Sequence, residues 1–419
     1  MSGDEVALVE VVVLEVEPGV DPMPAFDRAW ARGARVLPLP RTLPAAAREA
    51  LVARVRVVRA GPDAVRGATR GATRGSTPGA MLGAGLVLPT SGSSGVPRLI
   101  DISLEAMQAS ALLGARAVPF GPGDRWHGSL APSHIGGIMI LMRARHLGGT
   151  VRFGAPPRAW SDLAGCTHVS LVAAQLARLL DDPAPVPASL KAVMLGGGPS
   201  PHALHERAIA RGVPLYSTYG MTETCSQVAT GRRLAGDPET LAGPPLPGVS
   251  ITIDPACGEI LVDGPTLARG EIVDGAILPL QRPLRTRDVG ELDALGRLHV
   301  VGRLDSMFIS GGRNIHPETI ERALLAIDGV RSACVVAVPD ARWGMRPVAF
   351  VDAFVDAFVG ASVDATAPAL RAALREALEP HLVPDRLLAM PADEAASMKP
   401  SRARLAARLA AGERFAEHA

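Results

Sequence analysis

Lysine is almost missing from this chain of 419 residues. Of its 43 basic residues only Lys191 and Lys399 are lysines, and all the others are arginines. The two side chains differ in shape, because arginine presents a flat fork and lysine a compact point charge on a thin stem. A lysine near the C-terminus of such a chain therefore suggests a site that needs one compact cation, although chance could also leave two lysines behind.

Aromatic residues, net charge and paired cysteines are also scarce. Aromatics make up 3% of the chain and the formal net charge is +1, which offers little to nucleic acid, so we expect no such partner. The four cysteines show no CxxC pair or metal-ligand spacing, which favours reduced thiols in a cytoplasmic protein: Cys166, Cys225, Cys257 and Cys334.

Long apolar runs are missing as well. The N-terminus, MSGDEVALVEVVVLEVEPG, is acidic and interrupted by glutamates, so we expect neither a signal peptide nor a membrane span there. The apolar run at 135–142 is too short to cross a bilayer.

The part of the chain before residue 305 alternates between strand and helix patterns. Strands are expected at 7–16, 86–89, 167–174, 191–195 and 213–220, a helix at 104–113, and a flexible loop at the glycine-rich residues 61–80. Between the last two strands lie a glycine turn and a helix with Ser200 as N-cap and Pro201 at its first position. This βαβ unit predicts a parallel sheet covered by helices.

The character changes after about residue 305. A helix is expected to begin at Pro317, with Ile320, Leu324 and Ile327 on one face, followed by two strands and another helix. The sequence therefore predicts an α/β protein with a large N-terminal domain (1–304) of parallel or mixed sheets covered by helices. A small, mobile α+β C-terminal domain (305–419) would follow it, joined at GRLDSM (302–307).

A serine- and glycine-rich segment, LPTSGSSGVPR (88–98), follows one of the expected strands. Its hydroxyls and unhindered backbone N–H groups are suited to phosphate oxygens: Thr90, Ser91, Gly92, Ser93, Ser94 and Gly95. The segment is not a Walker A loop, because no Gly-Lys-Ser/Thr follows. Taken alone, it would more often be an ordinary turn.

Two later segments carry further polar groups. In YSTYGMTETCSQVAT (216–230), Thr222 and Glu223 follow Tyr219-Gly220 at the end of a strand, where ligands of open α/β sheets bind. A tyrosine can stack on a base, and a carboxylate beside a hydroxyl can hold Mg²⁺ on a polyphosphate, although a capped turn fits equally well. Downstream, Asp288 could accept hydrogen bonds from a ribose, and Gly311 and Gly312 permit close approach to a ligand.

In this order the segments resemble the adenylate-forming superfamily of acyl-CoA synthetases, peptide-synthetase adenylation domains and luciferases, over roughly residues 80 to 405. TSGSSGVPR is similar to the family's phosphate-binding loop, and YGMTE matches its adenine- and magnesium-binding motif. The resemblance implies that nucleotide is also bound by Gly197, Gly198, Gly220, Met221, Asp288 and Arg303. It further implies that Glu223 is the metal ligand, Asp305 the hinge and Lys399, in KPSR (399–402), the catalytic lysine.

The family's chemistry explains why one compact cation fits. A substrate carboxylate attacks the α-phosphorus of ATP, and one ammonium bridging the carboxylate and the α-phosphate stabilises the charge that develops there. The resemblance implies ATP, Mg²⁺ and CoA as co-substrates and cofactor. It also implies a swing of the small domain about Asp305 that presents Ser310, Gly311 and Gly312 to the CoA thiol.

Two stretches, 129–144 and 193–230, look most like the o-succinylbenzoate–CoA ligases of menaquinone biosynthesis. In that reading His134 lies at the mouth of the acid pocket, Gly196 to Gly198 form its floor and Gln227 borders it. A structural histidine at a helix start is the alternative for His134. We expect His202 and His205 to be solvated on an exposed helix, Cys225 to serve packing and Lys191 to lie at the surface.

The chain departs from the family at two positions, since Arg98 replaces a loop lysine and Arg287 replaces the glycine before Asp288. We predict an AMP-forming ligase that joins o-succinylbenzoate to CoA, with small-molecule partners and, as is common, a homodimer. Another aryl- or acyl-acid–CoA ligase is one alternative. A non-catalytic nucleotide-binding module of the same fold is the other.

Overall fold

The computed structural model describes residues 8–17, 19–55, 58–59, 84–90, 97–198, 200–327, 329–353, 363–395 and 400–417. Several sequence predictions fall wholly or partly outside them: residue 7 of the strand at 7–16, the loop at 61–80, residues 91–95 of the phosphate loop, and Lys399. The same holds for the last part of the second strand expected after the Pro317 helix, at 348–359.

The strands of the described residues form four sheets. The first is mixed and has the order β1-β4-β17-β16-β6-β5-β3-β2. Its strands are β1 (Leu8–Val9), β2 (Val11–Val16), β3 (Arg35–Pro40), β4 (Val58–Arg59), β5 (Gly85–Thr90), β6 (Arg98–Ser103), β16 (Gly270–Val273) and β17 (Ala276–Pro279). The strand predicted at 86–89 is present as β5, whereas the residues predicted to form one strand at 7–16 form two, β1 and β2, which pair with different strands.

The second sheet is the predicted parallel one. Its order is β12-β11-β10-β9-β7-β8, and every neighbouring pair except β11 with β12 is parallel. Its strands are β7 (Arg125–Gly128), β8 (Thr150–Phe153), β9 (His168–Leu171), β10 (Ala192–Leu195), β11 (Leu215–Met221) and β12 (Ser226–Arg232). The apolar patterns of β9 and β10 fit strands that are buried on both faces.

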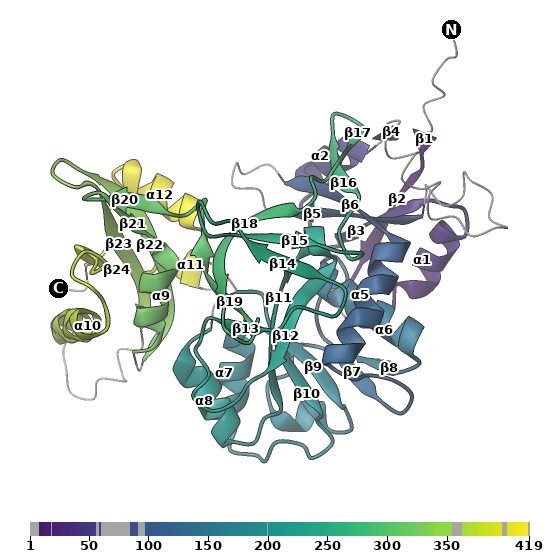
Figure 1. The fold of residues 1–419 in the computed structure, drawn as a ribbon, viewed down its shortest axis with the longest axis horizontal. Helices are drawn as coiled ribbons and strands as arrows, with labels where there is room; N and C mark the ends of the chain where they lie inside the picture. The colour runs from purple at the N-terminus through teal and green to yellow at the C-terminus, as the bar shows by residue number, and fades with distance from the viewer. Residues whose placement is uncertain are drawn as a thin grey trace, which may run out of the picture.

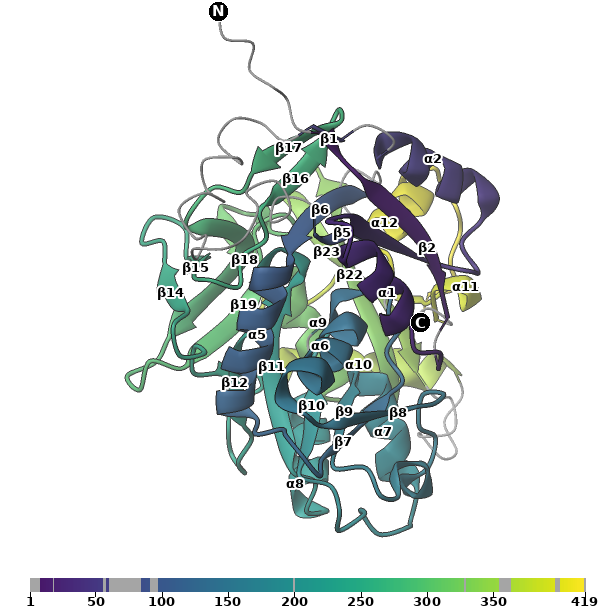
Figure 2. The same ribbon diagram turned by 90° about the vertical axis from the view of Figure 1, so that its right-hand side faces the viewer.

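Helices cover both faces of these two sheets and separate them. The helices are α1 (Met23–Trp30), α2 (Ala45–Val55), α5 (Leu104–Ala117), α6 (Ile135–Leu147), α7 (Ala173–Asp181) and α8 (His202–Ala210), with short 3-10 turns η1 (Trp160–Leu163) and η2 (Thr222–Thr224). Figure 2 shows α5 and α6 between β6 and the strands β10 to β12. Residues of α5 and α6 pack with β5 and β6 in one core, while α7 and α8 pack on the other face of the second sheet.

The third sheet is antiparallel and has the order β13-β19-β18-β15-β14. Its strands are β13 (Leu241–Gly243), β14 (Ser250–Ile253), β15 (Glu259–Asp263), β18 (Leu284–Leu292) and β19 (Leu298–Arg303). Tyr219 and Val228 of the second sheet share a core with its apolar residues, so the two sheets meet at β11 and β12.

The fourth sheet belongs to a smaller C-terminal domain, on the left in Figure 1. Its elements are β20 (Phe308–Ser310), β21 (Arg313–Ile315), α9 (Pro317–Leu325), β22 (Val330–Asp340), β23 (Gly344–Ala353), α10 (Val363–Ala377), β24 (Arg386–Ala389), α11 (Ala392–Ala395) and α12 (Arg402–Ala410). The predicted helix does begin at Pro317, and its Ile320 and Leu324 are fully buried against β22 and β23. The predicted α/β class with a smaller C-terminal α+β domain is confirmed.

None of the helices within the described ranges combines the length and the apolar character that crossing a bilayer requires.

Candidate active site

A hydrogen-bonded chain of polar side chains lies where the second and third sheets meet. Tyr219, near the end of β11, donates a hydrogen bond of 2.8 Å to the carboxylate of Asp288 on β18. Burial raises the pKa of the Tyr219 phenol well above its ordinary value, so this group stays protonated and donates. The other Asp288 oxygen lies 3.0 Å from the guanidinium of Arg303, which is its partner residue across the β18–β19 ladder.

The hinge residue predicted from the sequence lies at the end of this chain. Arg303 also contacts Asp305 at 3.3 Å, and Arg287 forms an ion pair with the same carboxylate. The structure thus brings together four residues that lie in separate motifs of the sequence: Tyr219, Asp288, Arg303 and Asp305.

The backbone explains why a glycine is usual at the position of Arg287. Arg287 has φ of +63°, in the left-handed region that costs an L-residue about 1–2 kcal/mol. Its N–H is held by Glu259 at 2.8 Å, and its carbonyl accepts from the Leu304 N–H at 2.8 Å. Arg287, in place of the glycine, therefore keeps the backbone turn before Asp288 and adds an ion pair with Asp305.

The YGMTE segment turns sharply from β11 into β12. Gly220 is required there, because a Cβ atom would lie 1.9 Å from the carbonyl oxygen of Ser226. Met221 is the last residue of β11, and Thr222 and Glu223 form the turn η2. The Glu223 carboxylate points at Arg98, whose Nη1 lies 3.1 Å from Oε1.

Glu223 and Thr222 supply the donor atoms that magnesium prefers, a carboxylate beside a hydroxyl. The carboxylate side chain is 12% exposed and already attracts one cation, so its oxygens are available to a positive charge. The residues therefore fit a magnesium ion held by Glu223.

The strands that flank the phosphate loop are in register. Thr90, the last residue of β5, pairs with Arg98, the first of β6. This pairing places both ends of the loop beside the Glu223 turn. Ser91, Gly92, Ser93, Ser94 and Gly95 lie outside the described residues.

A buried arginine that the sequence reading did not single out lies beside Gln227. Arg143 of α6 donates a hydrogen bond of 3.0 Å to the side-chain oxygen of Gln227, and its guanidinium lies 5.4 Å from the ring centre of Trp126. Burial lowers its pKa to about 10, and no carboxylate in the described ranges lies within ion-pair distance. The side-chain nitrogen of Gln227 is also buried without a partner among these residues.

The other predicted acid-site residues lie at the start of α6 and after β10. His134 is the N-cap residue of α6, the helix that carries Arg143, and it is exposed. Gly196 follows β10 and packs against Thr218 of β11, with Gly197 and Gly198 next in sequence. Because β10 and β11 are parallel, this glycine turn and the YGMTE turn lie at the same edge of the sheet.

One histidine prediction was wrong. His205 was expected to be solvated, but it is 1% exposed, and it bonds to Ser200 Oγ at 2.6 Å and to Arg233 at 2.8 Å. Arg233 can only donate, so Nδ1 accepts and Nε2 carries the hydrogen that points at Ser200. The helix also begins one residue late: Pro201 is the N-cap, and Ser200 bonds His205 instead.

The structure agrees with the non-catalytic roles expected for Cys225 and Lys191. Cys225 is buried and burial raises the pKa of its thiol, which fits packing. Lys191 is exposed and pairs with Asp124 at 2.7 Å.

Ser310, Gly311 and Gly312 lie apart, in the C-terminal domain. Ser310 pairs with Arg313, so Gly311 and Gly312 form a two-residue hairpin turn, and both have the positive φ that such a turn needs. Among the described residues, no hydrogen bond or ion pair joins these three to the Tyr219–Asp288 chain. Lys399 lies outside the described residues, while Arg402, three residues on, pairs with Glu318 and Glu321.

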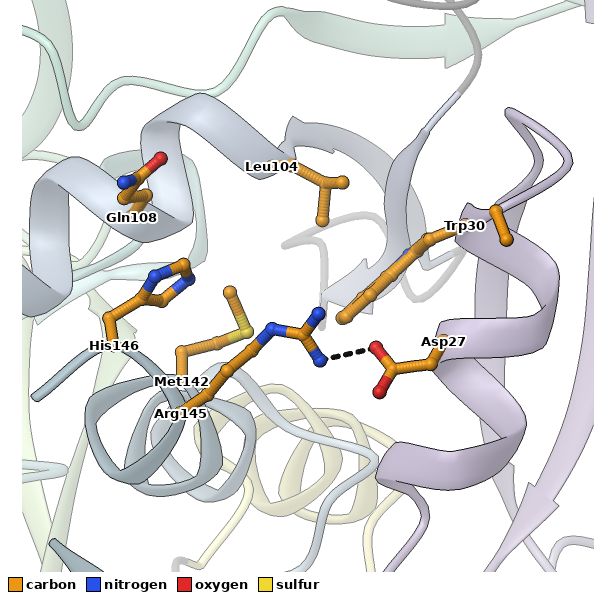
Figure 3. A pocket seen from close by; sticks show the side chains of 8 residues that line it. Asp27, Trp30, Leu104, Gln108, Met142, Arg145 and His146 are labelled. Atoms are coloured by element: carbon orange, nitrogen blue, oxygen red, sulfur yellow. Dashed lines mark hydrogen bonds and ion pairs between the residues drawn. The ribbon is translucent and has the colours of Figure 1, made fainter. Parts of the chain in front are cut away.

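A pocket of about 490 Å³ lies elsewhere, between α1, α5 and α6. Figure 3 shows Arg145 reaching across it to Asp27, beside Trp30. None of the residues predicted for the site lines this pocket.

Comparison with known proteins places the chain. The AMP-binding enzyme family matches residues 84–272, and the AMP-binding enzyme C-terminal domain matches residues 319–396. The 2-succinylbenzoate–CoA ligase of Salmonella typhimurium is 38% identical over 76% of this chain and 71% of its own length. The Escherichia coli enzyme of that name is 39% identical over 63% of this chain. The match covers only 57% of the length of the Escherichia coli enzyme.

Solved structures agree. A variant of Escherichia coli MenE with bound OSB-AMS has a TM-score of 0.75 and 30% identity, covering 97% of this chain and 88% of that one. Bacillus subtilis MenE in complex with ATP and magnesium has a TM-score of 0.73 and 25% identity, covering 91% and 86%. The chain is therefore a member of the AMP-binding, adenylate-forming enzyme family, and within it of the 2-succinylbenzoate–CoA ligases.

Proposed function

We propose that this protein activates 2-succinylbenzoate with ATP as an acyl-adenylate and transfers the acyl group to CoA. Arg143 is the observation that carries the choice of acid. 2-Succinylbenzoate has two carboxylates, one of which reacts while the other stays ionised. A buried charge costs several kcal/mol unless it is paired, so the second carboxylate needs a buried cation.

Arg143 is suited to that role. It is a buried guanidinium without a carboxylate neighbour in the described ranges, and the unpartnered Gln227 nitrogen beside it is a second donor. A planar fork binds a carboxylate with two parallel hydrogen bonds. A monocarboxylic acid would leave these donors unpaired, at a cost of about 1–3 kcal/mol each.

The nucleotide would lie along the edge formed by the carboxyl ends of β10 and β11. Asp288, oriented by Tyr219 and Arg303, accepts hydrogen bonds from the ribose hydroxyls, and the glycine turn at 196–198 leaves room for the base. Glu223 would hold magnesium, which neutralises charge on the departing pyrophosphate. Lys399 would supply the ammonium between the acid and the α-phosphate.

We place the boundary between the domains at residues 304 and 305. β19 ends at Arg303 and the fourth sheet begins at Phe308, which supports a hinge at Asp305. In this proposal the SGG turn at 310–312 approaches the CoA thiol after the small domain rotates. A cytoplasmic location and a homodimer are part of the proposal.

The decisive experiment offers the protein ATP, Mg²⁺ and CoA with 2-succinylbenzoate, benzoate or a fatty acid. Pyrophosphate release and a thioester are expected with 2-succinylbenzoate. Turnover of benzoate or fatty acids, but not of 2-succinylbenzoate, would reject the choice of acid.

Lysine variants test the chemistry. Lys399→Ala should bind ATP as the wild type does, measured by calorimetry. Its rate of pyrophosphate release should fall by about a hundredfold or more. Lys191→Ala is the matched control, because Lys191 is the other lysine and is exposed. An unchanged rate in Lys399→Ala would remove the assigned role.

A further inference from the structure

Arg98 bridges two carboxylates that come from distant parts of the chain. Its Nε and Nη2 each lie 2.8 Å from Glu271 of β16, and its Nη1 lies 3.1 Å from Glu223. The Glu271 contact is the largest cause of the raised pKa of Arg98. Both nitrogens of one edge of the fork thus engage Glu271, and the remaining one engages Glu223.

The strand ladder does not need this bridge. β6 and β16 are already paired through Gly270 with Asp101 and Glu271 with Ile100. Glu223 is tied to the same region by a backbone bond of 2.8 Å from the Ala268 N–H to its carbonyl. The position of the Glu223 backbone is therefore fixed without the guanidinium, and the bridge acts on the charge of its carboxylate.

The charges of the three groups do not cancel. Two carboxylates share one guanidinium, so the cluster carries one net negative charge and Glu223 is only partly neutralised. A lysine at position 98 is a single point charge and could not hold Glu271 with two nitrogens while contacting Glu223.

We propose that Glu271 anchors Arg98 as an exchangeable counter-ion of Glu223, which gives way to magnesium when the metal binds. This rests on the proposed role of Glu223 as the metal ligand. Glu271 is then a positioning residue: it keeps part of the Arg98 charge away from Glu223 and holds the guanidinium after the exchange.

The proposal makes opposite predictions for the two partners. Arg98→Met leaves Glu223 without a counter-ion, so a divalent cation binds more tightly. Glu271→Gln leaves the whole Arg98 charge to Glu223, so a divalent cation binds more weakly. Because Arg98 is partly exposed, we expect each change to be about two- to fivefold.

The test measures Mn²⁺ binding to the nucleotide-free, full-length protein from the electron paramagnetic resonance signal of free Mn²⁺. Arg98→Lys should fall between the wild type and Arg98→Met, and Glu223→Gln should lose the site. Thermal unfolding of each variant checks that it is folded.

Tighter binding in Arg98→Met together with weaker binding in Glu271→Gln supports the exchange. The exchange is overturned if Arg98→Met and Glu271→Gln bind Mn²⁺ as tightly as the wild type, or if both shift the affinity in the same direction. Unchanged Mn²⁺ binding in Glu223→Gln also overturns it. Thioester formation by the wild type is measured separately, so a failed exchange and a failed ligase assignment give different results.

Discussion

The Tyr219 hydroxyl donates a 2.8 Å hydrogen bond to the Asp288 carboxylate, which lies 69 residues further along the chain and in a different sheet. Arg303 holds the other oxygen of the same carboxylate. Asp288 is thereby oriented from two sides before any ligand arrives, which would preorganise it for the proposed contact with a ribose.

Tyr219→Phe should weaken ATP binding by about tenfold or more. The variant keeps the ring but removes a hydrogen bond to a charged group, which typically contributes about 1.5–3 kcal/mol. Calorimetric titration with ATP measures the loss. Tyr216→Phe is the control, because Tyr216 is the other tyrosine of the chain and lies on the same strand. Equal affinities for Tyr219→Phe and wild type would contradict the role of this bond.

Arg287→Gly should be more stable than Arg287→Ala by about 0.5–1 kcal/mol. Both variants lose the ion pair with Asp305, but only glycine adopts the left-handed backbone of this position without strain. Urea denaturation of the two variants gives the difference directly. A more stable alanine variant would show that the backbone does not hold this conformation.

Acid should destabilise the protein through His205. Burial and the nearby Arg233 lower the pKa of His205 from 6.5 to about 3 in the folded protein. Below pH 6.5 the unfolded chain binds a proton that the folded chain does not. This contribution to stability is therefore complete above pH 6.5 and is lost as the pH falls towards 3, by up to about 1.4 kcal/mol per pH unit.

The free energy of unfolding, measured between pH 7 and pH 5, checks this slope. His205→Gln should flatten it, whereas His202→Gln, at a more exposed position of the same helix, should not. An identical slope in wild type and His205→Gln would assign the acid sensitivity to other groups.

Arg143→Lys should raise KM for 2-succinylbenzoate by about tenfold or more and leave KM for ATP unchanged. Lysine keeps the charge but loses the fork that binds a carboxylate with two hydrogen bonds. Steady-state pyrophosphate release, with each substrate varied in turn, separates the two constants. A parallel rise in both would point to a structural defect in α6.

Patterns local in sequence predicted the architecture well. The strand, glycine turn and helix at 191–210 and the helix start at Pro317 depend on neighbouring residues, and the structure has all of them. The motifs and their order also indicated the family, because each motif is a short contiguous segment that can be recognised without knowing the fold.

Contacts between residues far apart in the sequence could not be predicted from such local patterns. His205 looks like a surface histidine in the sequence, but it is buried in the structure, where Arg233, the residue after β12, contacts it. Glu271 has no motif, and its contact with Arg98 spans 173 residues. Arg143 left one signal, a single charge within the apolar run IGGIMILMRA, which is unusual for a buried helix face.

The discontinuous first sheet has a consequence for how the chain folds during synthesis. β16 and β17, at 270–279, complete an edge that β6 leaves open from residue 103 onwards. During synthesis this edge stays unpaired while more than 160 further residues are added, so we expect the nascent large domain to be prone to aggregation until the β16–β17 hairpin emerges.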